Sequence, residues 1–111
     1  SPYSAAKHGV VGLMRSLALE LAPNQVRVNT VHPTSVYTPM IINDVFPKLV
    51  RMDLPDPGEA EAAEFLKEMQ PMGNPWIHVD DVSNTILFLC SDDARYITGS
   101  SIAIDAGALT K

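Results

Sequence analysis

The sequence predicts an α/β fold in which helices cover part of a parallel sheet, of the doubly wound type and incomplete on its own. An apolar pattern at helical spacing over residues 4–22 leads through a short turn into a β-branched run at 26–31. A later helical pattern, ending at Cys90, is followed by a second short β-type run at 101–104. Helix, turn and strand in this order form the second half of a βαβ unit, whose strands run parallel.

The first helix and strand are each bounded by recognisable breakers. Ser1 or Ser4 can cap the helix, residues 22–24 end it with a proline, and the strand stops at His32 and Pro33. The helix is expected to bury one apolar face. The residues at helical spacing on this helix are Val10, Val11, Met14, Leu17, Ala18 and Leu21.

The middle of the chain is less regular. Residues 34–39 read as a loop, and residues 40–52 carry apolar side chains at partly helical spacing, interrupted by Pro47. The alanine- and glutamate-rich run at 59–69 predicts a helix. Its inward-facing residues are expected to be Phe65, Leu66 and Met69.

The last helix is expected to begin with Asp80 or Asp81 as its N-cap and to end at Cys90, before a connection at 91–99. Cys90 is the single cysteine of the chain, so we predict a small core residue without a disulfide. The residues expected to bury this helix are Val82, Ile86, Leu87, Leu89 and Cys90.

Two strands are too few for a stable parallel sheet. Both edges of such a pair keep unpaired backbone groups, and much of the sheet and helix surface stays exposed to solvent. Residues 1–111 are therefore expected to be one portion of a single larger domain.

Composition narrows the possible functions. The chain is 46% hydrophobic and carries a formal charge of −5, which argues against nucleic acid and anionic membranes as partners. No apolar stretch approaches the roughly 20 residues that cross a bilayer, and no signal peptide is recognisable. We therefore expect a cytoplasmic protein. Paired acids at 80–81 and 92–93 read as helix-end charges, and no zinc-type spacing exists, so no metal site is predicted.

Tyr3 and Lys7 are the first candidates for chemistry. Four residues apart on a helix, they lie on one face. A free tyrosine, with a pKa near 10, is a poor proton donor or acceptor at neutral pH, and a nearby ammonium group stabilises its phenolate form. This spacing is common by chance, so two ordinary surface residues remain the alternative on spacing alone.

The surrounding motifs resemble the short-chain dehydrogenase/reductase family. They are the active-site helix Tyr-Ser-Ala-Ala-Lys-His-Gly-Val-Val-Gly-Leu at 3–13, Val-Arg-Val-Asn-Thr-Val-His-Pro at 26–33, Val-Tyr-Thr-Pro-Met at 36–40 and Ile-Asp-Ala-Gly at 104–107. The resemblance covers the chain apart from about residues 41–75. It implies the C-terminal part of a Rossmann-like dinucleotide-binding domain and an NAD(P)-dependent oxidoreductase acting on an alcohol or carbonyl.

The resemblance also implies roles for individual residues. Tyr3 would be the general acid in reduction and the base in oxidation, and Lys7 would assist it and hold the nicotinamide ribose. The loop after the strand would line the nicotinamide, with the backbone of Val36 and the hydroxyl of Thr38 nearest the cofactor. Such a loop is where open parallel sheets bind ligands. The expected cofactor-binding residues are Tyr3, Lys7, Pro33, Thr34, Val36 and Thr38.

Thr34 departs from the glycine usual in this family. With His32 and Pro33 it resembles the subgroup related to carveol dehydrogenase, often called mycofactocin-coupled, which implies tightly held NAD; NADP is not excluded. His32 itself reads as structural. An apolar group beside the loop suggests a cyclic or terpenoid alcohol, with ordinary helix packing as an equal alternative. The candidate substrate-pocket residues are Tyr37, Met40, Ile41 and Phe46.

The family's glycine-rich fingerprint and catalytic serine are not recognisable here, and we expect both to precede Ser1. The expected partners are therefore the missing N-terminal half, a small alcohol or ketone, and further copies in a homotetramer. Three alternatives stay open. They are a catalytically silent, self-associating fragment, a non-catalytic interaction module, and an NADPH-dependent 3-oxoacyl or ketone reductase.

Overall fold

The computed structural model describes residues 1–110, which fold as two compact units. The first unit contains residues 1–32 and 84–103, and the second contains residues 33–83 with the residues that follow 103. Helix α4, Val79–Cys90, has residues in both units. Short 3-10 turns lie at Ala22–Asn24, Asp92–Ala94 and Ala108–Thr110.

Helix α1 spans Pro2–Leu21 and confirms the predicted first helix. It begins two residues earlier than the apolar pattern because Ser1 is the N-cap, its hydroxyl accepting from the Ser4 N–H at 3.3 Å. Met14 and Ala18 are its buried residues. Every residue from Ser1 to Val10 is exposed, so the first turns of the helix stand free of the core.

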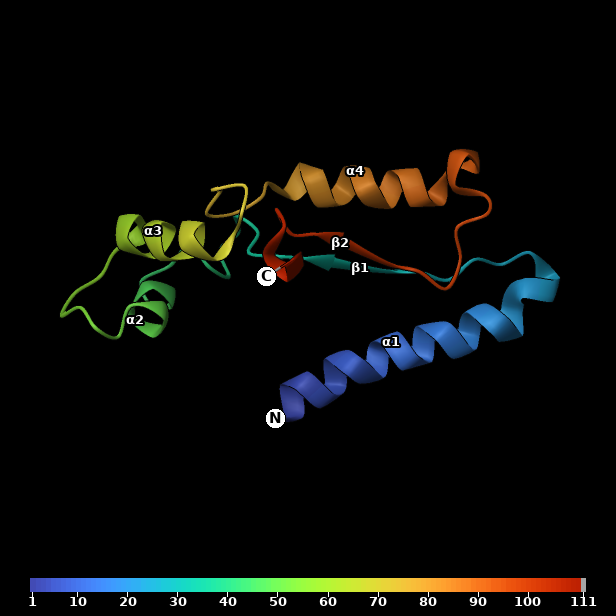
Figure 1. Ribbon diagram of the computed structural model, residues 1–111, viewed down its shortest axis with the longest axis horizontal. Helices are drawn as coiled ribbons and strands as arrows, with labels where there is room; N and C mark the ends of the chain where they lie inside the picture. Colours follow the sequence, from blue (N-terminus) through green and yellow to red (C-terminus); the bar gives the residue numbers. More distant parts are fainter. Residues whose placement is uncertain (111) are drawn as a thin grey trace. The chain divides into compact units, whose positions relative to one another are not determined.

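The sheet has two strands, β1 at Thr30–Pro33 and β2 at Ser101–Ile104, which run side by side in Figure 1. The Thr30 N–H donates to the Ser100 carbonyl at 3.0 Å, and the Thr34 N–H donates to the Ile104 carbonyl at 3.1 Å. Donor and acceptor numbers advance together, so the strands are parallel as predicted. The predicted bounds of β2 are confirmed.

The predicted start of β1 was wrong, because residues 26–29 are not strand. The Val28 N–H donates to the side-chain oxygen of Thr98 at 3.1 Å, which takes the place of a strand partner. Asn29 donates to the Ile97 carbonyl at 2.8 Å and accepts from the Ser100 N–H at 3.1 Å. Polar side-chain bonds, together with a backbone bond from the Gly99 N–H to the Val28 carbonyl at 2.8 Å, therefore hold this segment where β propensity suggested a continued strand.

Arg27 ties the same segment to the end of α4. Its guanidinium donates to the Leu89 carbonyl at 2.6 Å and to the Ile97 carbonyl at 3.3 Å. The last carbonyls of a helix have no partner within it, and a cation there is favourable. Arg27 is therefore a structural residue of the first unit.

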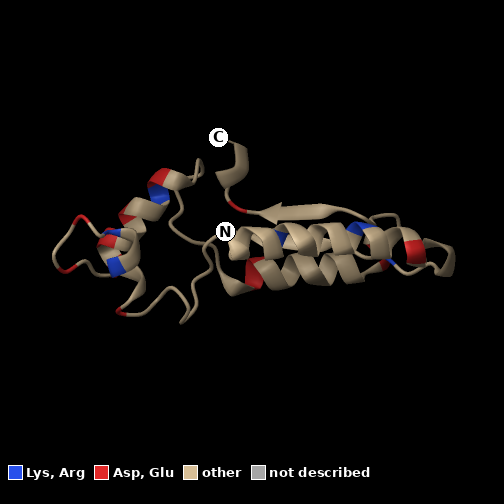
Figure 2. Ribbon diagram, turned by 90° about the horizontal axis from the view of Figure 1, so that it is seen from below, with Lys and Arg blue, Asp and Glu red and all other residues tan. Residues whose placement is uncertain are grey.

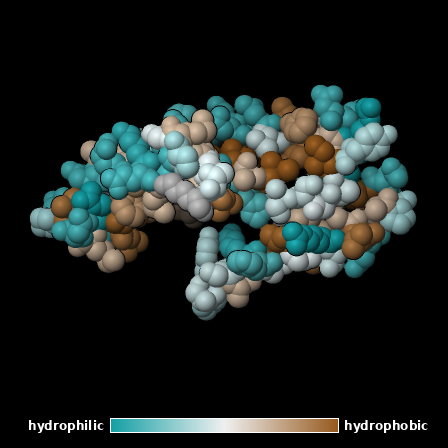
Figure 3. All heavy atoms as spheres, in the orientation of Figure 1, coloured by the Kyte–Doolittle hydropathy of each residue, from teal (hydrophilic) through white to brown (hydrophobic). Residues whose placement is uncertain are grey.

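Helix α4 does not bury the face predicted for it. Among the expected core residues only Leu89 is buried, whereas Leu87 is 71% exposed and Cys90 is exposed. Two strands offer too little surface to cover a helix of this length, so much of α4 stays exposed. The expectation of a buried Cys90 was therefore wrong. Figure 3 shows hydrophobic side chains open to view between α4 and the strands and again along α1. The exposed large hydrophobic residues of α1 and α4 include Val10, Leu13, Leu19, Ile86, Leu87 and Phe88.

The start of α4 also differs from expectation. The helix begins at Val79, and the Asp81 carboxylate accepts from the backbone N–H of His78 at 3.0 Å. Asp81, in the first turn of α4, thus accepts from the residue just before the helix, and this bond is one half of a capping box. Neither Asp80 nor Asp81 is the N-cap residue itself.

The second unit contains α2, Phe46–Val50, and α3, Glu59–Met69, which pack together. The predicted bounds of α3 are confirmed, and Leu66 is buried. Met69 is 52% exposed, so its predicted inward position was wrong. Pro47 does not interrupt a longer helix but lies in the first turn of α2, where a proline is tolerated. At the start of α2, Asn43 Oδ1 accepts from the N–H groups of Val45 and Phe46.

Charged side chains gather mainly around α2 and α3, as Figure 2 shows. Arg51 forms an ion pair with Asp53 at 2.8 Å, and this hydrogen bond holds the pKa of the Asp53 carboxyl below its usual range. Among residues 1–110, no helix is long and apolar enough to span a membrane. The same residues contain no cluster of three potential His, Cys, Asp or Glu metal ligands.

Glu61 gives α3 a pH-dependent start. Its carboxylate accepts from the backbone N–H of Gly58 at 2.9 Å, and this bond lowers the pKa of Glu61. A lowered pKa in the folded state stabilises the fold above the pKa of the unfolded chain, and the stabilisation is lost as the pH falls through the folded value. We predict that Glu61→Ala lowers the urea midpoint at about pH 7 and that the difference shrinks below about pH 4.

The matched control is Glu64→Ala, which removes an exposed carboxylate of the same helix paired only with the side chain of Lys67, at 2.8 Å. Urea unfolding followed by circular dichroism at both pH values measures the effect. Equal midpoint losses at the two pH values for Glu61→Ala would contradict the capping role.

Candidate functional site

Tyr3 and Lys7 lie in the first two turns of α1, in the first unit. The Lys7 ammonium is 5.5 Å from the centroid of the Tyr3 ring, within the range of a cation–π contact. Tyr3 is 72% exposed, so its hydroxyl lies in a part of the helix that a ligand can reach. Ser4 lies between them, and its carbonyl is 2.8 Å from Nδ1 of His8. The helical spacing therefore places the phenol and the ammonium group on one face, as predicted.

The predicted cofactor loop belongs to the second unit and begins where β1 ends. The Thr34 N–H donates to the Ile104 carbonyl, which fixes the loop at its first residue. Val36 forms an isolated parallel bridge with Ile77. In this bridge the Tyr37 N–H donates to the Ile77 carbonyl at 2.9 Å, and the Ile77 N–H donates to the Ser35 carbonyl at 3.0 Å. The loop is therefore held by backbone bonds at both ends.

Thr38 and Val36 are half-buried and contact each other. The Thr38 hydroxyl donates to the Val36 carbonyl at 3.3 Å. The Thr38 carbonyl accepts from the N–H groups of Ile41 and Ile42 at 3.0 and 2.9 Å, which turns the chain toward α2. The Thr38 oxygen keeps lone pairs for a further donor, since a hydroxyl accepts as well as donates. Pro33 is exposed and Thr34 half-buried at the start of this loop.

Tyr37 points to a neighbouring segment. Its ring lies 5.0 Å from the ring of Trp76, at 52° between the planes. Its hydroxyl donates to the Glu59 carboxylate at 3.4 Å. Tyr37 thus connects the loop with residues 76–77 and with the first residue of α3.

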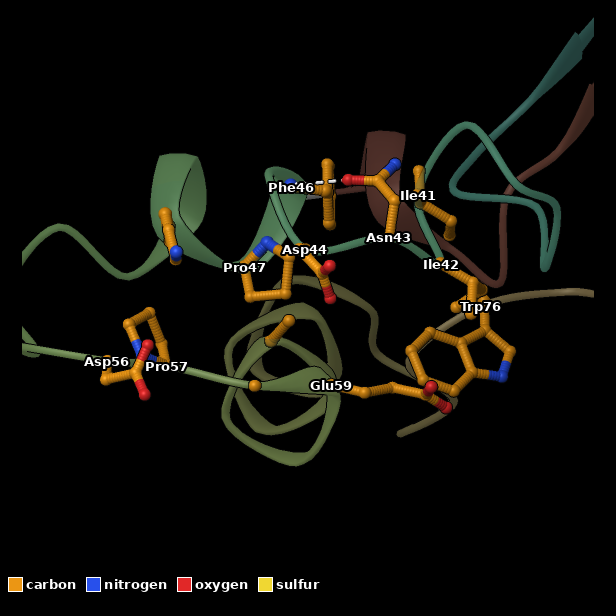
Figure 4. A pocket seen from close by; sticks show the side chains of 13 residues that line it. Ile41, Ile42, Asn43, Asp44, Phe46, Pro47, Asp56, Pro57, Glu59 and Trp76 are labelled. Carbon is orange, nitrogen blue, oxygen red and sulfur yellow. Dashed lines mark hydrogen bonds between the residues drawn. The ribbon is translucent and has the colours of Figure 1, made fainter.

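A cavity of about 510 Å³ opens between α2 and α3, within the second unit. Figure 4 shows the ring of Trp76 and the side chains of Ile41, Ile42, Phe46 and Glu59 around it. The size falls in the usual range for small-ligand sites. Of the four predicted pocket residues, Ile41 and Phe46 line this cavity. Tyr37 and Met40 do not, and Met40 is 84% exposed.

Sequence reasoning left Trp76 undecided between packing and function, and it did not single out Glu59. Both line the cavity and both contact Tyr37. The only signal in the sequence was a lone tryptophan after a proline- and glycine-containing turn at 71–75. A second cavity of about 270 Å³ lies in the first unit, but its polar residues Arg27 and Asn29 are already bonded to backbone carbonyls.

Comparisons with known proteins agree with one another. A family model described as enoyl-(acyl carrier protein) reductase matches residues 1–109. The chain is 54% identical over 111 residues to a (−)-trans-carveol dehydrogenase of Rhodococcus erythropolis, covering 100% of this chain and 40% of the relative. It is 49% identical to a putative short-chain type dehydrogenase/reductase of Mycolicibacterium smegmatis, over 98% of this chain and 39% of the relative.

Among solved structures, a carveol dehydrogenase from Mycobacterium avium in complex with NAD is similar, with a TM-score of 0.94 and 50% identity. The match covers 98% of this chain and 39% of that one. The chain therefore spans about two fifths of the length of the proteins it matches.

The bridge at Ile77 gives a direct test of how the loop is held. We predict that Ile77→Pro, which removes the N–H donated to Ser35, frees the loop and speeds hydrogen exchange of the Tyr37 amide by about tenfold or more. Hydrogen exchange measured by NMR gives the rate for this amide. Ile77→Val keeps the N–H and should leave the rate unchanged. An unaltered Tyr37 rate in the proline variant would show that the bridge does not hold the loop.

Proposed function

This chain belongs to the short-chain dehydrogenase/reductase family, and from that premise we propose that it is a portion of an NAD(P)-dependent oxidoreductase that interconverts an alcohol and a carbonyl compound. The observation that carries the proposal is the pair of Tyr3 and Lys7 on one exposed helix face, in a chain 54% identical to a carveol dehydrogenase. The phenol supplies a hydroxyl that can donate and accept a proton, and the Lys7 ammonium lies beside its ring.

The residues present suit a bound dinucleotide. The hydroxyls of Tyr3 and Thr38 and the ammonium of Lys7 are hydrogen-bonding groups for ribose and carboxamide. The loop carrying Val36 and Thr38 follows the carboxyl end of a parallel strand, the usual place for ligands in such sheets. NAD is the cofactor we assign, because the similar structure from Mycobacterium avium is a complex with NAD. NAD, when bound, supplies the hydride acceptor of oxidation and the hydride donor of reduction.

The chain's own contribution is proton transfer and orientation. In oxidation, the Tyr3 oxygen takes the proton from the alcohol hydroxyl as the C–H hydride leaves the carbon. In reduction, Tyr3 returns a proton to the carbonyl oxygen. Lys7 places a positive charge beside the tyrosine ring and would hold the ribose hydroxyls of the cofactor. Pro33 and Thr34, at the start of the loop, would help to hold the nicotinamide portion of the cofactor.

We assign an apolar cyclic or terpenoid alcohol as the substrate class. The cavity walls at Ile41, Phe46 and Trp76 are apolar or aromatic, which suits a hydrocarbon body. The name of the relative from Rhodococcus erythropolis, a carveol dehydrogenase, supports the same class. A self-associating, silent fragment is the alternative that the exposed apolar faces of α1 and α4 would favour.

We further propose that the remainder of the dehydrogenase domain covers these faces and that the complete protein is a homotetramer. Leu19 on α1 is 80% exposed and Leu87 on α4 is 71% exposed, and burying such side chains stabilises a fold by roughly 1.5–3 kcal/mol each. A partner that carries the cofactor fingerprint would complete both the sheet and the cofactor site.

Replacing Tyr3 in the full-length dehydrogenase tests its role. We predict that Tyr3→Phe lowers kcat for carveol oxidation by about 10²-fold or more, because the phenyl ring cannot take the proton. The control is Tyr96→Phe. Tyr96 is also exposed and also has a cation over its ring, Arg95 at 5.4 Å, so it matches Tyr3 in setting. Equal rates for Tyr3→Phe and wild type would remove Tyr3 from the mechanism.

Reconstitution tests the partner. We predict that the 111-residue chain alone gives no alcohol-dependent NAD reduction and that adding the complementary portion of the domain restores it. Absorbance of NADH follows the reaction, and a mixture made with the Tyr3→Phe chain is the control. Measurable turnover by the 111-residue chain alone would contradict the dependence on a partner.

A further inference from the structure

Tyr37 is attached to its surroundings in three ways, all within the second unit. Its backbone N–H donates to the Ile77 carbonyl at 2.9 Å, its ring lies 5.0 Å from that of Trp76, and its hydroxyl donates to Glu59 at 3.4 Å. The ring is 41% exposed, so burial in a core does not fix its position. Side-chain contacts with Trp76 and Glu59 therefore set its direction.

The two ends of these contacts have different roles. Tyr37 lies between Val36 and Thr38, the loop residues assigned to the cofactor. Trp76 and Glu59 line the cavity between α2 and α3, which we assigned to the substrate. Figure 4 shows the Glu59 side chain extending toward the Trp76 ring at one end of that cavity. A shift of Trp76 or Glu59 at the cavity wall would therefore alter the contacts of the Tyr37 side chain.

We propose that Tyr37 is a positioning residue which, with Trp76 and Glu59, couples filling of the cavity to the placement of the cofactor loop. The inference rests on the proposed function and goes beyond it, since it assigns Tyr37 to communication between the two binding regions instead of to the pocket wall. We call these three residues the clasp.

Two kinds of contact hold the clasp together, namely a hydrogen bond and a contact between aromatic rings. The phenol hydroxyl of Tyr37 donates to the Glu59 carboxylate at 3.4 Å, longer than the roughly 2.5–3.0 Å usual for an O–H···O bond, so this contact is a weak hydrogen bond at the surface. The tilted rings of Tyr37 and Trp76, with centroids 5.0 Å apart, lie within the range of a favourable aromatic contact. Glu59 is the first residue of α3, where its carboxylate oxygens serve as the acceptor of this bond. An apolar ligand against Trp76 stabilises the ring in the position that Tyr37 contacts.

Coupling of this kind is reciprocal. An alcohol that fills the cavity strengthens cofactor binding, and the cofactor strengthens binding of the alcohol by the same factor. The factor is measurable as the ratio of two dissociation constants for NADH, without and with a saturating alcohol. NADH and an alcohol form a complex that cannot react, because both are in the reduced form.

The test uses the full-length dehydrogenase with NADH and carveol as the probes. In the wild type we expect carveol to tighten NADH binding by about three- to tenfold, the range of one net hydrogen bond. Tyr37→Phe keeps the ring and removes the donated hydroxyl, and Glu59→Ala removes its acceptor. Each should bring the ratio close to one, and the double variant should be no worse than either single variant.

Glu59→Gln keeps an acceptor oxygen and should restore most of the ratio. Glu64→Ala, on the same helix but outside the cavity lining, is the control that should leave it unchanged. A residue with a purely structural role would weaken NADH binding equally with and without carveol, so the ratio itself separates the two roles. NADH fluorescence measures both constants.

Two outcomes overturn the inference while the proposed function stands: a wild-type ratio of one in an active enzyme, or an unchanged ratio in Tyr37→Phe. A full-length wild-type protein that reduces no NAD with carveol or related alcohols would overturn the proposed function. That result would also overturn the coupling role of the clasp, which rests on the proposed function.

Discussion

The backbone hydrogen bonds along residues 28–37 are the constraint on which the candidate site depends. Val28, Thr30 and Thr34 bond to the segment that contains β2, and Tyr37 bonds to Ile77. These bonds decide where β1 stops and where the loop with Val36 and Thr38 begins. A strand partner and an isolated bridge thus set the backbone positions of the groups assigned to the cofactor.

Sequence patterns correctly predicted the features that depend on residues close together in the chain. The bounds of α3 and β2 and the shared face of Tyr3 and Lys7 follow from spacing, and the structure reproduces them. The start of β1 could not be predicted, because it depends on the hydroxyl of Thr98 far along the chain. Burial of Leu87 and Cys90 was wrongly expected, because periodicity identifies an apolar face but not whether a neighbour covers it.

The site shows the same division. The chemistry proposed for Tyr3 depends on neighbours in sequence, and the motif therefore predicts it. The contacts of Tyr37 with Trp76 and Glu59 join three separate segments, so no spacing rule connects them. Ile41 and Phe46 were placed beside a cavity by their apolar character, whereas Met40 has the same character and points to solvent.

Exposure of Cys90 has a practical consequence. The chain contains one cysteine and one tryptophan, and the exposed thiol at the end of α4 belongs to the first unit whereas Trp76 belongs to the second. A maleimide dye on Cys90 would therefore make an energy-transfer pair with the native indole without any added label site. The efficiency of transfer would report the arrangement of the two units in solution.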